Sequence, residues 1–424
     1  MRKIKVLTIF TNTTGGVGFF RSYQPHDMLS KMYPDEFEVK VMTKPSFNDY
    51  HKFDEFDIVH FHKGVYFKDP LEQQVFTNLL KYLKERGIVT IMDIDDHWKL
   101  PTYHPQRVIR EKERQNKNIV NTEEMIKYNL SSVDYVTTTT TFFAKAIKPF
   151  NEKVYVFPNA INPDDEHFQI HRKPCDKLRF GFVMGSSHEK DLDTMDNFAA
   201  KLPKEVLDKI EIVLCGFDTN GRSVIFNPDG TTSKRELAPT DSVWYRYEKM
   251  LTNDYRNISP EYKEFLMKFD SSSEYADAEK EGYKRCWTKD MDNYFQHYNE
   301  IDVLLAPLDE NDFNLVKSEL KPVECCFSHT AFIGSNFGPY TIGLRNLFKK
   351  GGEIDTEGNA ILIDRNRAHK DWVKAIEKLV KHPEYVKTLQ DNLYRDFHEK
   401  YDLRNVTVKR AEFYREITKY RINK

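Results

Sequence analysis

The chain has 424 residues, which is enough for two or three domains that each bury a core of their own. Its 64 basic and 66 acidic residues leave a net charge of −2 and so exclude a general electrostatic attraction to nucleic acid. No stretch reaches the roughly 20 consecutive apolar residues of a membrane-spanning helix, which favours a soluble protein.

The N-terminus and the cysteines indicate a cytoplasmic protein. The apolar run that begins at Ile4 is short, alternates with polar residues and lacks a small-residue cleavage site, as in a first strand rather than a signal peptide. The five cysteines are too few and too irregularly spaced for a disulfide framework. We therefore expect the protein to work in a reducing compartment.

Short runs rich in β-branched residues alternate with helical patterns along the first part of the chain. These runs are residues 3–10, 37–42, 57–62, 88–94, 134–140 and 153–158. Such alternation is typical of βα units that build a parallel sheet. We interpret residues 1–170 as one Rossmann-like domain.

A second series of such runs follows a polar link near residue 170. It comprises residues 178–184, 210–217, 301–308, 330–335 and 360–363. Residues 171–404 are therefore expected to form a second Rossmann-like domain. The region 219–287 is polar and irregular and is interpreted as an insertion in this domain. The amphipathic C-terminal segment 405–424 is expected to be a helix that packs back on the first domain.

The stretch FNLVKSELKPVECC, from Phe313 to Cys326, follows a predicted buried strand. Ser318 is a plausible N-cap, and the free amides of a helix N-terminus bind anions. Lys317 and Lys321 add cations there, and Glu324 shares a face with Lys321 one turn further on. The spacing fits a diphosphate site with a ribose-binding carboxylate, and it fits an ordinary capped helix with a Lys–Glu pair equally well.

In each half of the chain, a glycine-containing turn follows the first predicted strand. Gly15 and Gly16 belong to a loop that permits close backbone approach to a ligand, although it matches neither a phosphate-binding Walker motif nor a dinucleotide fingerprint. Gly185 and Ser186 open the corresponding turn in the second half. A tight turn without any ligand explains either sequence as well.

Carboxylates follow the predicted strand 88–94, at the edge where open α/β sheets bind ligands. Asp95 and Asp96 suit hydrogen bonding to sugar hydroxyls or general-base catalysis, and His97 follows them directly. Oxygen-rich clusters also bind Mg²⁺, but no matching cluster occurs elsewhere, so we expect no metal. Solvated carboxylates at a strand end are the alternative.

Together these segments resemble the GT-B glycosyltransferases, in particular the GT4-like family of bacterial surface-polysaccharide enzymes. The resemblance rests on segments in a fixed order: GGVGFFRSYQP, IMDIDDHW, five threonines, FPNAIN, FGFVMGSSHEKDL, DVLLAPLDENDFNLVKSELKPVE and SNFGPY. It implies an α/β GT-B fold, with two Rossmann-like parallel-sheet domains facing a central cleft. The N-terminal domain would bind the acceptor and the C-terminal domain the donor.

The resemblance also implies roles for residues of the second half. Lys317, Ser318 and Lys321 are similar in position to donor diphosphate contacts, and Glu324 resembles the ribose-binding glutamate that ends the family's E-x7-E motif. The first glutamate of that motif would fall at Val316, a departure that puts the identity of the donor sugar in doubt. A neighbour such as Asn314 would have to supply the missing contact.

The remaining roles complete this assignment. Gly15 and Gly16 would close over the donor, with Gly185 and Ser186 facing it from the second half. Asp95 or Asp96 would act on the acceptor hydroxyl. Arg21 and His97 are the expected acceptor contacts.

The expected activity is transfer of a hexosyl group from a UDP- or GDP-sugar, with retention of configuration and without metal or cofactor. The expected acceptor is a saccharide or a lipid-linked oligosaccharide, reached by peripheral contact with the inner face of the plasma membrane; no nucleic acid is expected as a partner. Two alternatives stay open. One is a GT-B scaffold or glycan-binding protein without catalysis, which the replacement at Val316 favours. The other is a sugar-nucleotide 2-epimerase.

Overall fold

The computed structural model describes residues 2–10, 16–43, 49–63, 69–104, 106–115, 120–217, 222–226, 232–236, 243–251, 283–349 and 351–422. The chain divides into two compact units. The first comprises Met1–Pro163, Asn311–Val323 and His398–Lys424, and the second comprises Asp164–Glu310 and Glu324–Phe397. Each unit is built on a six-stranded sheet.

The sheet of the first unit has the strand order β2-β1-β3-β4-β5-β6, and every neighbouring pair is parallel. Its strands are β1 (Ile4–Phe10), β2 (Phe37–Thr43), β3 (Ile58–His62), β4 (Val89–Ile94), β5 (Tyr135–Thr138) and β6 (Val154–Val156). All strands therefore end at the same edge, and the polar segments that follow them are brought together there.

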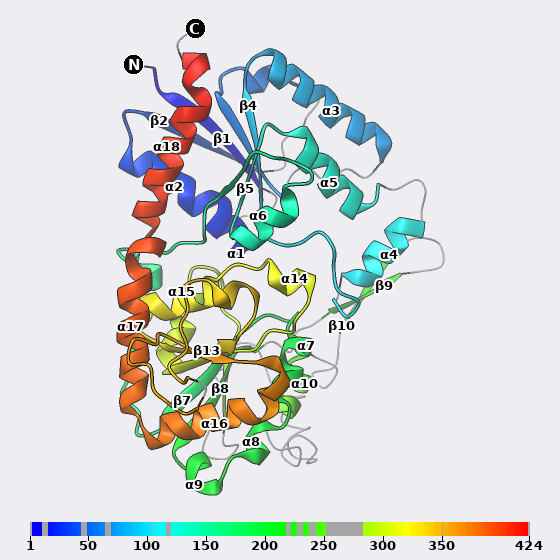
Figure 1. Ribbon diagram of the computed structural model, residues 1–424. Coiled ribbons are helices and arrows are strands. Elements are labelled where there is room, and N and C mark those ends of the chain that lie inside the picture. The colour runs from blue at the N-terminus through cyan, green and yellow to red at the C-terminus, as the bar shows by residue number, and fades with distance from the viewer. Residues whose placement is uncertain are drawn as a thin grey trace. The chain divides into compact units, whose positions relative to one another are not determined.

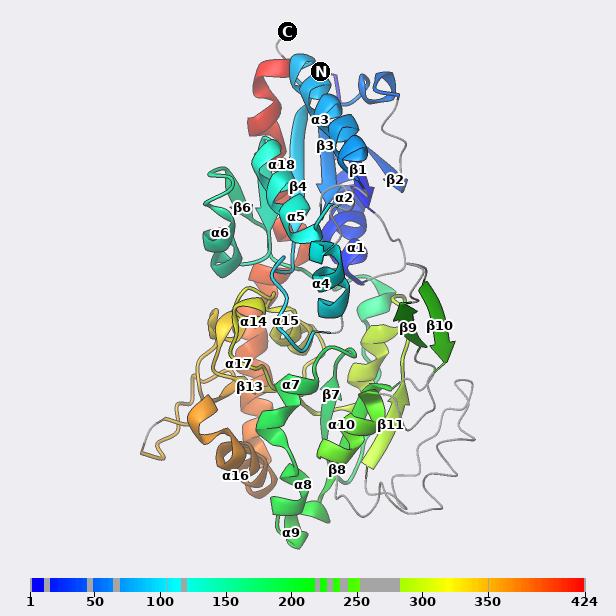
Figure 2. The ribbon, with the colours of Figure 1, turned by 90° about the vertical axis from the view of Figure 1, so that its right-hand side faces the viewer.

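Helices cover both faces of this sheet (Figures 1 and 2). α2 (Gln24–Met32) and α18 (Leu403–Ile422) pack on the face that carries Val6, Ile58 and Ile91. α3 (Pro70–Glu85) packs on the opposite face, on side chains that alternate with those three along the strands. The C-terminal helix α18 thus belongs to the core of the first unit. The other helical segments of this unit are α1 (Gly16–Gly18), the π-helical turn η1 (Phe19–Tyr23), η2 (His51–Phe53), α4 (Arg107–Gln115), α5 (Thr122–Ser132), α6 (Thr141–Ile147) and α14 (Asp312–Leu315).

The second sheet has the order β11-β8-β7-β12-β13-β14, and its pairs are likewise parallel. Its strands are β7 (Leu178–Val183), β8 (Ile210–Phe217), β11 (Tyr283–Trp287), β12 (Val303–Ala306), β13 (Ala331–Ser335) and β14 (Ile361–Ile363). Within region 219–287, β9 (Arg222–Phe226) and β10 (Thr232–Glu236) form a separate antiparallel pair. The end of that region, β11, is an edge strand of the main sheet.

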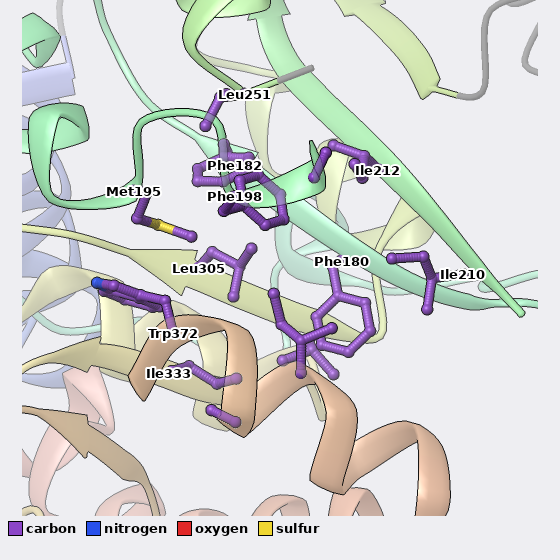
Figure 3. Close-up of a cluster of buried hydrophobic side chains, with 14 of the residues drawn as sticks. Phe180, Phe182, Met195, Phe198, Ile210, Ile212, Leu251, Leu305, Ile333 and Trp372 are labelled. Atoms are coloured by element: carbon purple, nitrogen blue, oxygen red, sulfur yellow. The ribbon is translucent and has the colours of Figure 1, made fainter. Parts of the chain in front are cut away.

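The core of the second unit lies between its sheet and α16 (Ala368–Lys381) (Figure 3). Trp372 of α16 is 1% exposed and packs in one cluster with Phe180, Phe182 and Leu305 from the strands. The other helical segments are η3 (Glu166–Phe168), α7 (Glu189–Leu192), η4 (Asp193–Met195), α8 (Phe198–Lys201), α9 (Lys204–Leu207), α10 (Val243–Leu251), η6 (Tyr294–Glu300), η7 (Gly338–Thr341) and η8 (Arg365–Arg367). α15 (Leu320–Phe327) and α17 (Glu384–Tyr401) contribute residues to both units. The predicted α/β class with two Rossmann-like parallel sheets is confirmed.

None of the described helices is long and apolar enough to cross a membrane.

Candidate active site

A buried ion pair holds the carboxyl edge of the first sheet. Asp93, the next-to-last residue of β4, accepts hydrogen bonds from Nε and Nη2 of Arg21, at 2.9 and 2.7 Å. Thr137 of β5 donates a third bond to the same carboxylate, at 2.6 Å. Burial alone would raise the pKa of Asp93, but the charge and hydrogen bonds of Arg21 hold it well below its usual value. Asp93 therefore stays ionised as an anchor.

Arg21 has little freedom to meet a ligand. Its side chain is 1% exposed, and Nη1 donates to the carbonyl of Phe157 at 2.7 Å and to Asn159 at 3.0 Å. The sequence prediction placed Arg21 against the acceptor. In the structure it instead ties η1 to β4 and to the segment that follows β6.

Lys63 brings two carboxylates together. It follows β3 with a left-handed φ of 56°, and its N–H donates to the carbonyl of Asp93 at 2.6 Å. Its Nζ lies 3.2 Å from Oδ1 of Asp95 and 2.9 Å from Oδ2 of Asp96. Sequence reasoning missed Lys63, although its position just after a neighbouring strand was a usable signal.

The two carboxylates differ in basicity. Burial, together with the charges of Asp96 and Asp93, raises the pKa of Asp95 to about 6 despite the attraction of Lys63. Asp96 also loses hydration, but Lys63 and Lys317 lower its pKa below the usual value. Asp95 is therefore the better proton acceptor near neutral pH, and Asp96 remains a fixed negative charge.

The segment 311–323 is fastened to the first unit. Asn311 caps α14 by accepting a bond from the backbone N–H of Asn314 at 3.0 Å, and it donates to the hydroxyl of Tyr103 at 2.8 Å. Thr140 donates to the carbonyl of Val316 at 3.4 Å. Val316 is 2% exposed and belongs to a buried apolar cluster of this unit. Val316 thus serves packing.

Lys317 and Ser318 lie next in this segment, and both are half-buried. Nζ of Lys317 lies 5.2 Å from the centre of the Phe313 ring, and its charge contributes to the lowered pKa of Asp96. Ser318 accepts a bond from the amide of Asn159 at 3.1 Å. Both residues are therefore positioned within the same unit as Asp95 and Asp96.

α15 begins at Leu320, with Pro322 in its first turn, where a missing N–H costs no intrahelical bond. Lys321 is half-buried, and Glu324 follows three residues later at 1% exposure. Tyr294 and Tyr298 donate to the two oxygens of Glu324, at 2.9 and 2.6 Å. The sequence analysis identified Glu324 but not these two tyrosines, which lie in η6 and are separated from it along the chain by β12 and α14.

The remaining predicted residues differ in exposure. Gly185 and Ser186 follow β7 and are exposed, and the carbonyl of Gly185 accepts from Tyr247 at 3.1 Å. Gly16 begins α1 and is half-buried, whereas Gly15 lies outside the described residues. His97 is half-buried, and its Nδ1 accepts a bond from the backbone N–H of Lys99 at 2.9 Å.

The fold matches those of several solved structures. HepE from Anabaena, solved with UDP and glucose, is 10% identical, and the match covers 97% of this chain and 99% of that one with a TM-score of 0.57. Sucrose-phosphate synthase from Thermosynechococcus elongatus is 12% identical, with coverages of 98% and 99% and a TM-score of 0.56. This chain has the GT-B fold. No protein-family model and no curated protein matches its sequence.

A third GT-B structure, an alpha-glucosyltransferase in complex with UDP-glucose and DNA containing an abasic site, is 11% identical to this chain. The match covers 98% of this chain and all of the other, with a TM-score of 0.55. At such identities the likeness concerns the GT-B fold alone. The chemistry of this chain must be argued from its own residues.

Proposed function

We propose that this protein is a glycosyltransferase that moves a hexosyl group from a UDP- or GDP-sugar to a hydroxyl of a saccharide or lipid-linked acceptor. The observation that carries the proposal is the pairing of Asp95, whose pKa is raised to about 6, with a nearby cationic segment that contains Lys317. A carboxylate suits the acceptor hydroxyl, and cations suit the diphosphate that leaves the donor. Solved GT-B proteins that hold UDP or UDP-glucose support the choice of donor class.

Lys317 and Lys321 suit stabilisation of the leaving group, the nucleoside diphosphate. Cleavage of a sugar–phosphate bond leaves negative charge on the diphosphate and positive charge on the anomeric carbon. Fixed cations aimed at the diphosphate stabilise that charge in the transition state. Lys317 is held at the end of α14, and Lys321 lies in the first turn of α15 beside the hydroxyl-bearing Ser318. These groups can act without a metal ion.

Asp95 suits the acceptor half. Its carboxylate is held by Lys63 at the carboxyl end of β4, and its raised pKa makes it a stronger base than an exposed aspartate. We assign it to the acceptor hydroxyl, as a positioning group in the retaining reaction we propose. In an inverting reaction the same carboxylate would be the general base. Asp96 holds Lys63 in place, and His97 is proposed to contact the acceptor.

Glu324 is proposed to bind the donor ribose. Each carboxylate oxygen accepts more than one hydrogen bond, so the tyrosine hydroxyls leave lone pairs for ribose. Tyr294 and Tyr298 fix the carboxylate in one orientation. Asn314 is proposed to make the sugar contact that Val316 cannot make. Gly185 and Ser186 are proposed as further donor contacts from the second unit, and Gly15 and Gly16 as donor contacts from the first.

The motifs of the chain extend this proposal to a GT4-like enzyme of bacterial surface-polysaccharide assembly. Such an enzyme would work in the cytoplasm, with peripheral contact to the inner membrane where a lipid-linked acceptor is presented. This finer assignment rests on the order of the sequence segments.

A donor screen tests the proposal. Calorimetry with UDP-glucose, UDP-galactose, GDP-mannose and their free diphosphates should show saturable binding of at least one nucleotide sugar. Lys321→Ala should weaken that binding, and Lys387→Ala, on the exposed face of α17, should not. Binding that is absent for every donor, or that is unchanged in Lys321→Ala, would reject the proposed site.

The replacement at Val316 favours one second candidate, a GT-B protein that binds a nucleotide sugar or glycan without catalysis. The two candidates differ in turnover. The assay measures release of UDP or GDP, with water or a panel of saccharides as acceptors. Release of the diphosphate supports the glycosyltransferase. Tight donor binding without any release of diphosphate supports the non-catalytic protein.

A further inference from the structure

A cavity of about 680 Å³ lies within the second unit, beside α16 and β14. This volume is within the range of roughly 300–1,000 Å³ that is typical of sites for small molecules. Its walls are α16, β14 and the segment that precedes Gly351 and Gly352. None of the residues to which we assign donor or acceptor contacts lines it.

The cavity carries an excess of positive charge. Its two acidic side chains are engaged: Asp371 pairs with Arg367 at 3.3 Å, and Asp364 accepts a bond from Asn336 at 2.7 Å. Lys374 and Lys378 also line it, and within the described parts of the chain neither forms an ion pair. The lining therefore has four cationic side chains against two carboxylates, and neither of these two lysines is paired with a carboxylate of the described residues.

The two lysines are held on one face of α16. They are four residues apart, and a like-charged pair at this spacing destabilises a helix. Nζ of Lys378 lies 4.0 Å from the centre of the Phe348 ring, which restrains it at the cavity wall. A dianion bound between the two lysines would remove their repulsion, whereas a monoanion would neutralise one charge.

The floor of the cavity is apolar, since Ile361, Ile363 and Ala375 contribute to its lining. β14 is an edge strand, but Asn346 occupies its free edge. Asn346 donates to the carbonyl of Leu362 at 3.0 Å and accepts from the N–H of the same residue at 3.3 Å. Addition of a peptide strand is thereby blocked at this residue, which leaves a small molecule as the better fit.

We propose that this cavity binds a phosphomonoester, with the phosphate between Lys374 and Lys378 and the organic part against the apolar floor. A phosphomonoester carries close to two negative charges at neutral pH, and lysine binds phosphate as a point charge. The phosphate can belong to a free metabolite or to a lipid headgroup. The proposal adds a second ligand to the protein and does not depend on the glycosyltransferase assignment.

Calorimetry with glycerol 3-phosphate tests the site on the full chain. Saturable binding is expected, and the double variant Lys374→Ala/Lys378→Ala should weaken it about tenfold or more, the effect of losing charge-assisted bonds. Lys370→Ala removes one lysine from the same helix outside the cavity and is the matched control for Lys374→Ala and Lys378→Ala measured singly beside the double variant. Thermal unfolding of each variant without ligand checks that the fold is intact.

A second arm distinguishes the sources of the phosphate. Vesicles of phosphatidylcholine with and without phosphatidic acid are sedimented with the wild-type chain and with both variants. Binding only to vesicles that contain phosphatidic acid, lost in the double variant and kept in Lys370→Ala, supports a lipid headgroup as the ligand. Binding of either probe that both variants lose equally, or that the double variant keeps, overturns the proposal. Absence of binding in both arms overturns it as well.

Discussion

Nζ of Lys63 lies 3.2 Å from Oδ1 of Asp95, yet the pKa of that carboxyl is raised to about 6. Burial and the neighbouring acids outweigh the one cation. The result is a carboxylate that is mostly ionised at neutral pH but more basic than an exposed aspartate. Its environment is set by residues at, or just after, the carboxyl ends of two adjacent strands, β3 and β4.

Asp95→Asn should reduce turnover by about 10²- to 10⁴-fold if the carboxylate handles the acceptor proton. Donor affinity should stay near the wild-type value, because this carboxylate is assigned to the acceptor. Release of UDP or GDP, measured with and without acceptor, checks the rate, and calorimetry checks donor binding. Glu38→Gln, on the exposed edge strand β2, is a control for loss of a single carboxylate. Equal turnover in Asp95→Asn and wild type would remove Asp95 from the site.

The pH–rate profile should have an acid limb near pH 6, because activity is lost as Asp95 gains a proton. Lys63→Asn should move that limb to higher pH, since removal of the cation raises the pKa of the carboxyl further. Asparagine tolerates the left-handed φ of 56° at this position, so the substitution removes the charge without forcing the backbone. A limb that stays in place, or that moves to lower pH, would contradict the assignment.

Lys317→Ala and Lys321→Ala should each weaken binding of UDP- or GDP-linked sugars by about 10- to 150-fold, the range expected for loss of a charge-assisted bond. Affinity for the corresponding nucleoside monophosphate should change less, because the proposed contacts are to the diphosphate. Calorimetric titrations with both ligands give the two ratios. A uniform loss of affinity for monophosphate and diphosphate would indicate a general electrostatic effect, and Lys387→Ala measures the size of that effect.

The sequence predicted the sheets and the strand-end residues better than their partners. Alternating β-branched runs and helical patterns revealed both parallel sheets, because parallel strands carry a strong local signal. Asp95 and Asp96 were identified for the same reason, since they directly follow a strand. Lys63 was missed because its role depends on the register between β3 and β4.

The roles of other residues depended on distant contacts that no local pattern records. Arg21 pairs with Asp93, 72 positions away in the chain. This buried ion pair occupies the guanidinium that was predicted to contact the acceptor. Tyr298 is 26 positions before Glu324, and from sequence alone an aromatic residue in that region is equally well explained by packing in the hydrophobic core. Sequence spacing thus supplied candidate residues but not the groups that orient them.

Tyr298→Phe should destabilise the protein and weaken recognition of ribose. The substitution removes one of two hydroxyls that donate to Glu324, a carboxylate that is 1% exposed. A buried acceptor that loses its partner costs about 1–3 kcal/mol. Denaturant unfolding measures the stability, and the ratio of affinities for UDP and 2′-deoxy-UDP measures ribose recognition. In Glu324→Gln, the ratio of UDP affinity to 2′-deoxy-UDP affinity should fall toward one, because the proposed ribose-binding carboxylate is gone.

Tyr385→Phe is the matched control for the loss of a hydroxyl, because Tyr385 is half-buried in the second unit and packs against Phe348. A Tyr298→Phe variant as stable as this control would show that the hydrogen bond to Glu324 contributes little. An unchanged ratio of UDP to 2′-deoxy-UDP affinity in Glu324→Gln would separate that carboxylate from the ribose.

The first unit should lose stability in mild acid because of three buried histidines. Burial lowers the pKa of His26 to about 3 and that of His62 to about 4, and it lowers the pKa of His60 well below the usual value. Since an unfolded histidine titrates near 6.5, the unfolded chain binds protons first as the pH falls below 6.5. Each histidine then costs about 2 kcal/mol at pH 5.

Charged neighbours modify this loss without reversing it. Asp95 opposes it by about 1 kcal/mol, since a raised pKa favours the protonated carboxyl of the folded chain as the pH falls toward 5. Asp93 has a lowered pKa, so its contribution is lost only below its unfolded value near 4. Urea unfolding between pH 7.5 and 5 should therefore show a falling midpoint, and His62→Gln should make the fall less steep. A midpoint independent of pH in this window would mean that the histidines are hydrated or already protonated in the folded protein.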